Sequence, residues 1–185
     1  MATATDQGED EDEDGEKSQD NSRDGRDKDG KPLLYLKDWH FQRLRGEKGS
    51  AVATKRETPF FFADDWLNWW WDRQGTDDYR FVYMGPPGSW TPLHHDVLNS
   101  FSWSFNVCGR KHWTLFAPEV TPHLYDRRVQ HDLYGRDLAT DVRRGRADAE
   151  KFPRLEEAPR LEVVQEPGEA IFVPSAWHHQ VRRDE

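Results

Sequence analysis

Several short segments of the chain alternate between apolar and polar side chains, which is the pattern of a β-strand with one buried face. The clearest case is residues 101–107, where one face carries Phe101, Trp103, Phe105 and Val107 and the other carries Ser102, Ser104 and Asn106. We expect the polar face of this strand to look onto solvent or a wet cavity. Apolar runs between Gly/Pro turns predict further strands over 79–84, 90–97, 111–116, 161–165, 169–173 and 177–182, and a short strand or turn over 32–41.

Two long segments and one helix interrupt this β pattern. Asp64 or Asp65 can cap a short helix that runs to about Arg73, because an aspartate side chain accepts hydrogen bonds from the free N–H groups of a first helical turn. Residues 42–58 are polar and predict a loop. Residues 117–160 are charged and contain several prolines, so we expect a long insert with little regular structure. Strands joined by Gly/Pro turns predict an all-β core, an antiparallel sandwich or barrel.

The composition fits one globular, intracellular domain. The chain has 185 residues, which is the length of a single domain, and no run approaches the roughly 18 apolar residues of a membrane-spanning helix. The N-terminus has neither the basic nor the apolar part of a secretory signal. Cys108 is the only cysteine, which excludes an internal disulfide framework and a multi-cysteine zinc site and indicates a reducing compartment. Trp69, Trp70 and Trp71 belong to an aromatic cluster that we expect in the core.

Most of the net charge of −9 lies in the first 31 residues, which hold 12 acidic and 5 basic side chains. This segment has almost no apolar side chains, so it cannot bury enough surface to offset its ordering entropy, and we expect a disordered acidic tail over 1–31 followed by one domain over 32–185. The tail would repel nucleic-acid phosphates, so direct binding to nucleic acid is not expected. Nothing in the sequence indicates the oligomeric state.

Two histidine pairs are candidate metal ligands. On a strand, residues i and i+2 point to the same face, so His94 and Asp96 can converge on one ion while His95 faces away. A third ligand from a distant strand would complete the two-histidine, one-carboxylate set of non-haem iron oxygenases. Adjacent strand residues point to opposite faces, so only one of His178 and His179 can serve. The spacing alone does not decide which.

At this point the sequence resembles a known family. The runs TPLHHD, GRKHW and PGEAIFVPSAWHHQV are similar to the JmjC (Jumonji C) oxygenases, which are cupin-like iron enzymes dependent on 2-oxoglutarate. Within them, the Jumonji-domain protein 4 group is the closer match. Its motifs are met by residues 79–83, 85–90, 92, 94–96, 100–103, 106–113 and 172–181. The resemblance covers about residues 33–182.

The resemblance implies a complete site. In the family pattern the metal-binding histidine is the second of the W-H-H trio, so Fe(II) would be held by His94, Asp96 and His179, with His178 facing outward. A lysine that binds the distal carboxylate of 2-oxoglutarate corresponds to Lys111. Thr91 matches a threonine that contacts the co-substrate in some relatives, and Ser104 stands where several relatives carry asparagine. Fe(II), 2-oxoglutarate and O2 are therefore the implied cofactor and co-substrates.

The resemblance also implies a double-stranded β-helix (jelly-roll) fold and a protein substrate. A jelly-roll continues with a final strand after the one that carries His179, and this sequence does not contain it, so we expect a fold that is shortened at its C-terminus. The implied activity is lysyl C-hydroxylation of the translation termination factor in the cytoplasm. Two alternatives stay open, a histone N-methyl-lysine demethylase, which would imply the nucleus, and an inactive cupin-like binding module.

Overall fold

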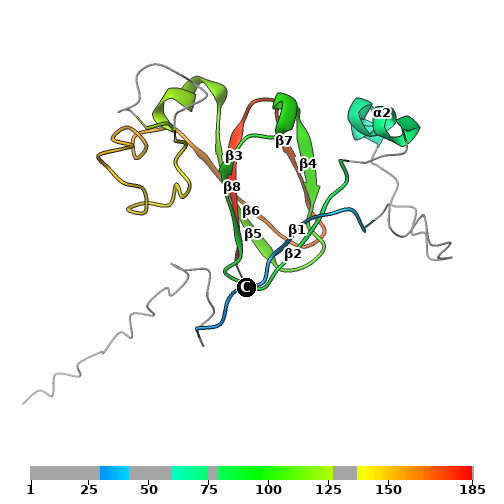
Figure 1. The fold of residues 1–185 in the computed structure, drawn as a ribbon, viewed down its shortest axis with the longest axis horizontal. Coiled ribbons are helices and arrows are strands. Elements are labelled where there is room, and N and C mark those ends of the chain that lie inside the picture. The colour runs from blue at the N-terminus through cyan, green and yellow to red at the C-terminus, as the bar shows by residue number, and fades with distance from the viewer. Residues whose placement is uncertain (1–29, 42–59, 75–78, 127–136, 185) are drawn as a thin grey trace, which may run out of the picture.

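The computed structural model describes residues 30–41, 60–74, 79–126 and 137–184 (Figure 1). Most of the expected acidic tail and all of the expected loop over 42–58 lie outside these ranges. The elements are β1 (Leu36–Trp39), η2 (Phe60–Phe62), α2 (Trp66–Gln74), β2 (Val82–Met84), β3 (Trp90–His94), η3 (Val97–Asn99), β4 (Ser102–Phe105), β5 (Arg110–Phe116), η4 (Pro118–His123), β6 (Leu161–Gln165), β7 (Ala170–Val173) and β8 (His178–Asp184). No helix in the described ranges is long and apolar enough to cross a membrane.

The strands form three antiparallel sheets that together make an all-β, jelly-roll core. The largest has four strands in the order β3-β8-β5-β6, and the other two are the pairs β4-β7 and β1-β2. Figure 1 shows β4 and β7 across from β3 and β8. Every strand predicted from the sequence is present, although β2, β3 and β4 are shorter than expected. Among the described residues no strand joins β2 to β4.

A buried amide ties the opposing sheets together. The side chain of Gln165 in β6 is 2 % exposed. It donates to the backbone carbonyls of Ser104 in β4 and Glu169 before β7, over 2.8 and 2.9 Å. The side chain of Asn106, which follows β4, donates in return to the Gln165 carbonyl over 3.2 Å. The polar face of the 101–107 strand therefore points into the space between the sheets, as its alternation predicts.

A β-bulge in β3 changes which side chains face the interior. Thr91 pairs with Val181 and His94 pairs with His179, so the four residues 91–94 of β3 lie opposite the three residues 179–181 of β8. Strict alternation would send Thr91 and His94 to opposite faces. The extra residue puts both of them opposite inward-facing residues of β8. Pro92 lies in this bulge on an edge strand, where its missing N–H costs no ladder hydrogen bond.

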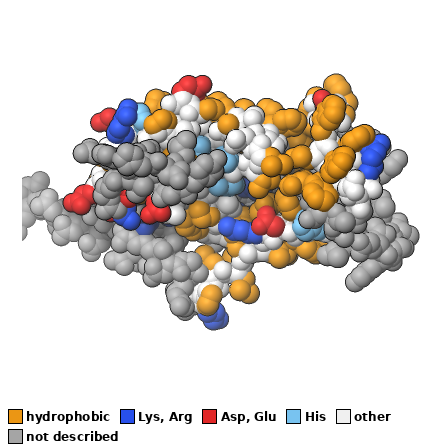
Figure 2. Space-filling view, turned by 45° about the horizontal axis from the view of Figure 1, so that its top comes forward, with side chains coloured by type: hydrophobic (Ala, Val, Ile, Leu, Met, Phe, Trp, Pro, Cys, Tyr) orange, Lys and Arg blue, Asp and Glu red, His pale blue; other side chains and the backbone are white. Residues whose placement is uncertain are grey.

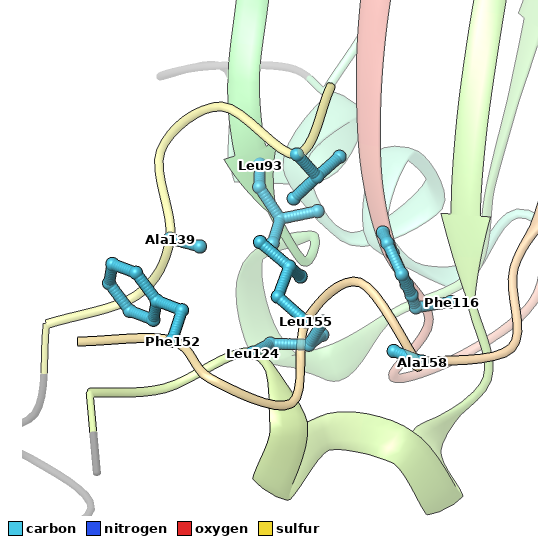
Figure 3. Packing of buried hydrophobic residues seen from close by; sticks show 8 residues of the cluster. Leu93, Phe116, Leu124, Ala139, Phe152, Leu155 and Ala158 are labelled. Carbon is cyan, nitrogen blue, oxygen red and sulfur yellow. The ribbon is translucent and has the colours of Figure 1, made fainter. Parts of the chain in front are cut away.

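The insert is more ordered than its composition predicts. Its described part contains η4 and a series of turns, and it packs beside β3 and β8, on the side away from β4 and β7 (Figure 1). Six of its residues form a hydrophobic core with Leu93 of β3 and Phe116 of β5 (Figure 3). The six are Leu124, Ala139, Val142, Phe152, Leu155 and Ala158. The insert therefore covers the part of the outer face of the four-stranded sheet around Leu93 and Phe116.

The aromatic cluster around α2 is not core. Asp65 caps this helix, since its carboxylate accepts from the backbone N–H of Asn68 over 3.1 Å. Trp66, Trp69 and Trp70 are nevertheless 51–71 % exposed. Figure 2 shows hydrophobic side chains gathered on the part of the surface that lies toward α2. The expected burial is therefore wrong for Trp69 and Trp70, whereas Trp71 is half-buried beside Tyr79.

Candidate metal centre

Three side chains meet at the end of the barrel where β3 and β8 lie together. His94 ends β3, Asp96 follows it in an extended conformation, and His179 is the second residue of β8. One ligand atom from each of them lies within 4.8 Å of the others. His94 and His179 pair directly across the strands, and their ring centroids are 4.3 Å apart.

The backbone sets the tautomer of both imidazoles. His94 Nδ1 is 2.8 Å from the carbonyl oxygen of Pro92, and His179 Nδ1 is 3.4 Å from that of Trp177. A carbonyl oxygen only accepts, so each Nδ1 is the donor, and in the neutral form of this tautomer the lone pair is on Nε2. This orientation of a ligand histidine by a backbone carbonyl is common in metal sites.

The acidic ligand is also oriented by a neighbour. The hydroxyl of Ser102 donates to Asp96 Oδ2 over 2.6 Å. This bond occupies one carboxylate oxygen and leaves the other available to an ion. Ser102 was expected only as part of a polar strand face, so its place beside a ligand is new. In the sequence, the only indication of this position was that Ser102 and Ser104 are two residues apart and so share one face of the 101–107 strand.

Burial keeps His179 neutral at ordinary pH. Its side chain is 4 % exposed, and this burial, with the nearby His94, lowers the pKa of His179 to about 4, although Asp96 opposes the shift. A neutral imidazole is the form that binds metals. The indole of Trp113 in β5 lies against the same ring, with centroids 5.7 Å apart and planes 29° apart.

The other two histidines occupy the opposite face of the sheet. His95 and His178 contact each other edge to face, with centroids 5.1 Å apart, and Tyr125 of the insert meets His178 at 6.0 Å. The parity expected for the two histidine pairs is therefore present. His178 does not reach solvent, however, because the insert covers it and leaves it 3 % exposed. Both of its ring nitrogens are buried, with no hydrogen-bond partner among the described residues.

The three expected co-substrate residues, Lys111, Thr91 and Ser104, lie on β5, β3 and β4. Lys111 of β5 donates from Nζ to Ser104 Oγ over 3.3 Å. Burial, and then the charge of Arg183, lower the pKa of this ammonium. Thr91 Oγ1 is 3.4 Å from the hydroxyl of Tyr35. Tyr35 precedes β1 and was not predicted as a site residue, because no local pattern links it to a partner 56 positions along the chain.

The donor set fits a divalent metal of the iron type. Two neutral imidazoles and one carboxylate on one side of an ion leave further coordination positions open to a co-substrate. The barrel wall beside them is apolar, since Trp113, Leu115 and Val173 form a cluster that is at most 5 % exposed. Such a wall limits the access of water to the ion.

A family model described as a cupin-like domain matches residues 9–185. The chain belongs to the cupin-like domain family. This result and the similarity to proteins named JMJD4 confirm the resemblance to the JmjC group that the motifs indicated. The cupin-like fold also agrees with the antiparallel sheets described above.

The relatives of this cupin-like chain are named as oxygenases and demethylases. The chain is 50 % identical over 150 residues to the 2-oxoglutarate and iron-dependent oxygenase JMJD4 of Gallus gallus, an alignment that covers 80 % of this chain and 32 % of the relative. It is 47 % identical over 165 residues to the arginine-specific demethylase JMJ20 of Arabidopsis thaliana, covering 80 % and 33 %. The bifunctional arginine demethylase and lysyl-hydroxylase psr-1 of Caenorhabditis briggsae is 33 % identical, covering 80 % and 37 %. The chain thus spans about a third of the length of these curated relatives.

Proposed function

We propose that this chain is the cupin-like domain of an Fe(II)- and 2-oxoglutarate-dependent oxygenase that hydroxylates a protein. The observation that carries the proposal is the convergence of His94, Asp96 and His179, whose ligand atoms lie within 4.8 Å of one another. The names of the JMJD4 relatives support iron as the metal and 2-oxoglutarate as the co-substrate.

Iron would be held by these three side chains, and it would supply the activation of O2 by which 2-oxoglutarate becomes succinate and CO2 while one oxygen atom enters a substrate C–H bond. The chain's own residues prepare this reaction. Ser102 orients Asp96, and Trp113 packs on His179. Lys111 would bind the distal carboxylate of the co-substrate as a charge-assisted pair. Ser104, which accepts from Lys111, and Thr91 would contribute hydroxyl contacts to the co-substrate.

We further propose that the substrate is a lysyl C–H bond of a translation termination factor and that the protein acts in the cytoplasm. Both rest on the resemblance to the JMJD4 group. A second candidate is N-demethylation, which the name of the Arabidopsis relative favours. The two outcomes share the same cofactor and differ only in which substrate carbon is oxidised, since a hydroxylated N-methyl group is released as formaldehyde.

The test is a turnover assay followed by mass analysis of the product. The chain is incubated with Fe(II), 2-oxoglutarate and peptides from a termination factor or from methylated histone tails, and succinate is quantified. A stable gain of one oxygen atom supports hydroxylation, and the loss of a methyl group supports demethylation. Absence of succinate with retained metal binding would favour the remaining alternative, a cupin-like binding module. Asp96→Ala is the control that separates turnover on this site from contaminating activity.

A further inference from the structure

An open cavity lies on the outer face of the β4-β7 sheet, on the side away from the metal centre. Ser102 points inward to Asp96, so its neighbour Trp103 points outward by the alternation of side chains along a strand. Phe172 of β7 is the direct partner of Trp103 across the ladder and shares this outer face. Phe62 of η2 lies nearly parallel to both rings, with centroids 5.1 Å from Trp103 and 5.8 Å from Phe172. The cavity is therefore separate from the three metal ligands.

The wall of this cavity is concave and almost wholly aromatic. Its volume is about 400 Å³, within the usual range of small-ligand sites. We call it the aromatic pocket, and it is lined by Phe61, Phe62, Asp64, Phe101 and Phe172. Phe61 meets Phe62 with ring planes 68° apart, and Phe101 is tilted by 37° against Phe172. These angles agree with a curved wall rather than a flat stack of rings.

The rings of the aromatic pocket are open to solvent. Phe61, Phe101 and Phe172 are 46–64 % exposed, so the described residues do not cover them. They belong to the part of the surface, toward α2, on which Figure 2 shows hydrophobic side chains gathered. A contiguous apolar patch of this kind on a protein surface marks a binding site. The chemistry of the lining then decides what binds.

The one charged residue in the lining is acidic. Asp64 is exposed, and among the residues that the structure describes no basic side chain forms an ion pair with it. The two acidic side chains that follow it are both used within the fold, because Asp65 caps α2 and Asp72 pairs with Arg80 at 2.8 Å. The charge of the aromatic pocket is therefore complementary to a cation that comes from outside it.

An aromatic wall with one carboxylate suits an alkylated ammonium group. The faces of aromatic rings attract cations through their quadrupole, and quaternary ammonium groups are bound in this way by cages of aromatic side chains. A primary ammonium has three N–H donors, and Asp64 is the only side chain of the lining that can accept them. Buried donors without acceptors are costly. N-methylation replaces these donors with carbon that packs on the rings, while the positive charge remains.

The charge of the lining also separates two sources of such a cation. A choline headgroup carries a phosphate close to its quaternary nitrogen, and that phosphate would meet the carboxylate of Asp64 with no basic side chain in the lining to offset it. A methylated lysine carries its charge at the end of an apolar chain and brings no anion. The aromatic pocket therefore favours the lysine side chain.

We propose that the aromatic pocket binds an N-methylated lysine side chain of a protein partner. The pocket would hold the partner on the outside of the barrel without presenting that lysine to the metal centre. This role goes beyond the proposed oxygenase activity, because binding in the pocket needs neither iron nor 2-oxoglutarate.

The experiment titrates small probes with the metal-free, full-length chain. The probes are the Nα-acetyl amides of lysine, dimethyl-lysine and trimethyl-lysine, the neutral analogue in which C(CH3)3 replaces the trimethylammonium group, and phosphocholine. Proton NMR of the terminal methyl or methylene group of each probe gives the affinity. An upfield shift of that signal reports enclosure by aromatic rings, which a contact with the outer protein surface would not produce.

Five variants locate the binding. Phe61→Ala and Asp64→Asn change the aromatic pocket at exposed positions. Phe60→Ala, one position away and outside the lining, and Glu119→Gln, at an exposed acid of η4, are their matched controls. Asp96→Ala removes a metal ligand and tests whether the two sites are independent. Circular dichroism confirms that each variant is folded.

We expect dimethyl-lysine and trimethyl-lysine to bind about tenfold or more tightly than lysine and the neutral analogue, with an upfield shift. Phe61→Ala and Asp64→Asn should each weaken this binding by about threefold or more. Phe60→Ala, Glu119→Gln and Asp96→Ala should leave it unchanged.

Several results would overturn the proposal. Equal affinity for the neutral analogue would show an apolar surface with no selectivity for a cation, and phosphocholine that binds as tightly as trimethyl-lysine would indicate a lipid headgroup site. Unchanged binding in both Phe61→Ala and Asp64→Asn would place the cation elsewhere, and loss of binding in Asp96→Ala would place it at the metal centre. Absence of binding by every probe would also contradict it. None of these outcomes would decide the proposed oxygenase function, which the succinate assay tests separately.

Discussion

The indole N–H of Trp113 donates to the side-chain oxygen of Gln165 over 2.9 Å, while the same indole lies against the imidazole of His179. Gln165 therefore fixes a ring that packs on a candidate metal ligand. The same amide also spans to the opposing sheet through the carbonyls of Ser104 and Glu169. One buried side chain thus connects the stability of the barrel to the geometry of the site.

Gln165→Leu should lower the free energy of unfolding by roughly 1–3 kcal/mol. The substitution leaves the indole N–H of Trp113 buried without its acceptor, which costs about that amount. It also removes one donor from the carbonyls of Ser104 and Glu169, although the Glu169 carbonyl keeps the backbone N–H of Asn106. Urea denaturation measures the change. Glu162→Gln, on an exposed position of the same strand, is the control and should stay within about 0.5 kcal/mol. A loss below about 1 kcal/mol for Gln165→Leu would show that the amide network is not stabilising.

The effect of a single substitution on metal binding should depend on which face of its strand the side chain occupies. His94→Ala, Asp96→Ala and His179→Ala each remove a donor from the triad, so we expect retention of Fe(II) or Co(II) to be lost. His95→Ala and His178→Ala change the opposite face and should largely spare metal binding. The absorption spectrum of bound Co(II) is the measurement. Metal binding that survives His179→Ala but not His178→Ala would reverse the ligand assignment.

Lys111→Met should weaken 2-oxoglutarate binding by roughly tenfold or more and leave metal binding intact. Methionine keeps the aliphatic stem and removes the ammonium, and a charge-assisted hydrogen bond contributes about 1.5–3 kcal/mol. Titration of the Mn(II)-loaded protein gives the affinity. Lys151→Met, in the insert, removes the same charge away from the barrel and is the control. An unchanged titration curve would remove Lys111 from the co-substrate site.

The chain should lose stability as the pH falls from about 6.5 toward 4. Burial, together with the neighbouring histidines, lowers the pKa of His178 to about 4 from an ordinary value of 6.5. Below pH 6.5 the unfolded chain therefore takes up a proton that the folded chain excludes, and this favours unfolding. Above pH 6.5 the His178 side chain is neutral in both the folded and the unfolded chain, so its protonation no longer lowers the free energy of unfolding.

His178→Phe should reduce this dependence on pH, because phenylalanine fills the same aromatic cluster without titrating. Melting temperatures between pH 7.5 and 4.5 test it. Tyr125→Phe alters the same cluster but removes no imidazole, so its melting curve should keep the original slope with pH. An identical slope for His178→Phe and the unsubstituted chain would contradict a protonation penalty at His178.

The alternation of side chains was sufficient to predict the strands and the inward polar face of 101–107, because residues two apart on a strand share a face. It was wrong about the apolar face of that strand, since Phe101, Phe105 and Val107 are 44–59 % exposed. Residues 161–165 match β6, and 101–107 contain β4. The histidine parity also followed from local geometry. The choice of His179 over His178 needed the family motif, because adjacent positions carry the same residue type.

Other features depend on contacts that no local pattern contains. The apolar residues of the insert are irregularly spaced, and they became a core only because Leu93 and Phe116 offer an outer face to cover. Tyr35 reached Thr91 through a pairing of distant segments. The burial predicted for Trp69 and Trp70 of α2 was wrong for the opposite reason. Large aromatic side chains usually pack in a core, but the fold brings no surface against these two.

The bulge in β3 has a consequence for anyone who would alter this barrel. Thr91 and His94 lie on the same side of the sheet only because β3 has one extra residue between them relative to β8. Removing a single residue between them would turn Thr91 to the other side of the sheet while every element kept its place. The number of residues between Thr91 and His94, and not the identity of their side chains, therefore determines that both lie on the same side of the sheet. Substitutions there should be tolerated far more often than deletions, and a library of one-residue deletions along β3 would locate the bulge without a structure.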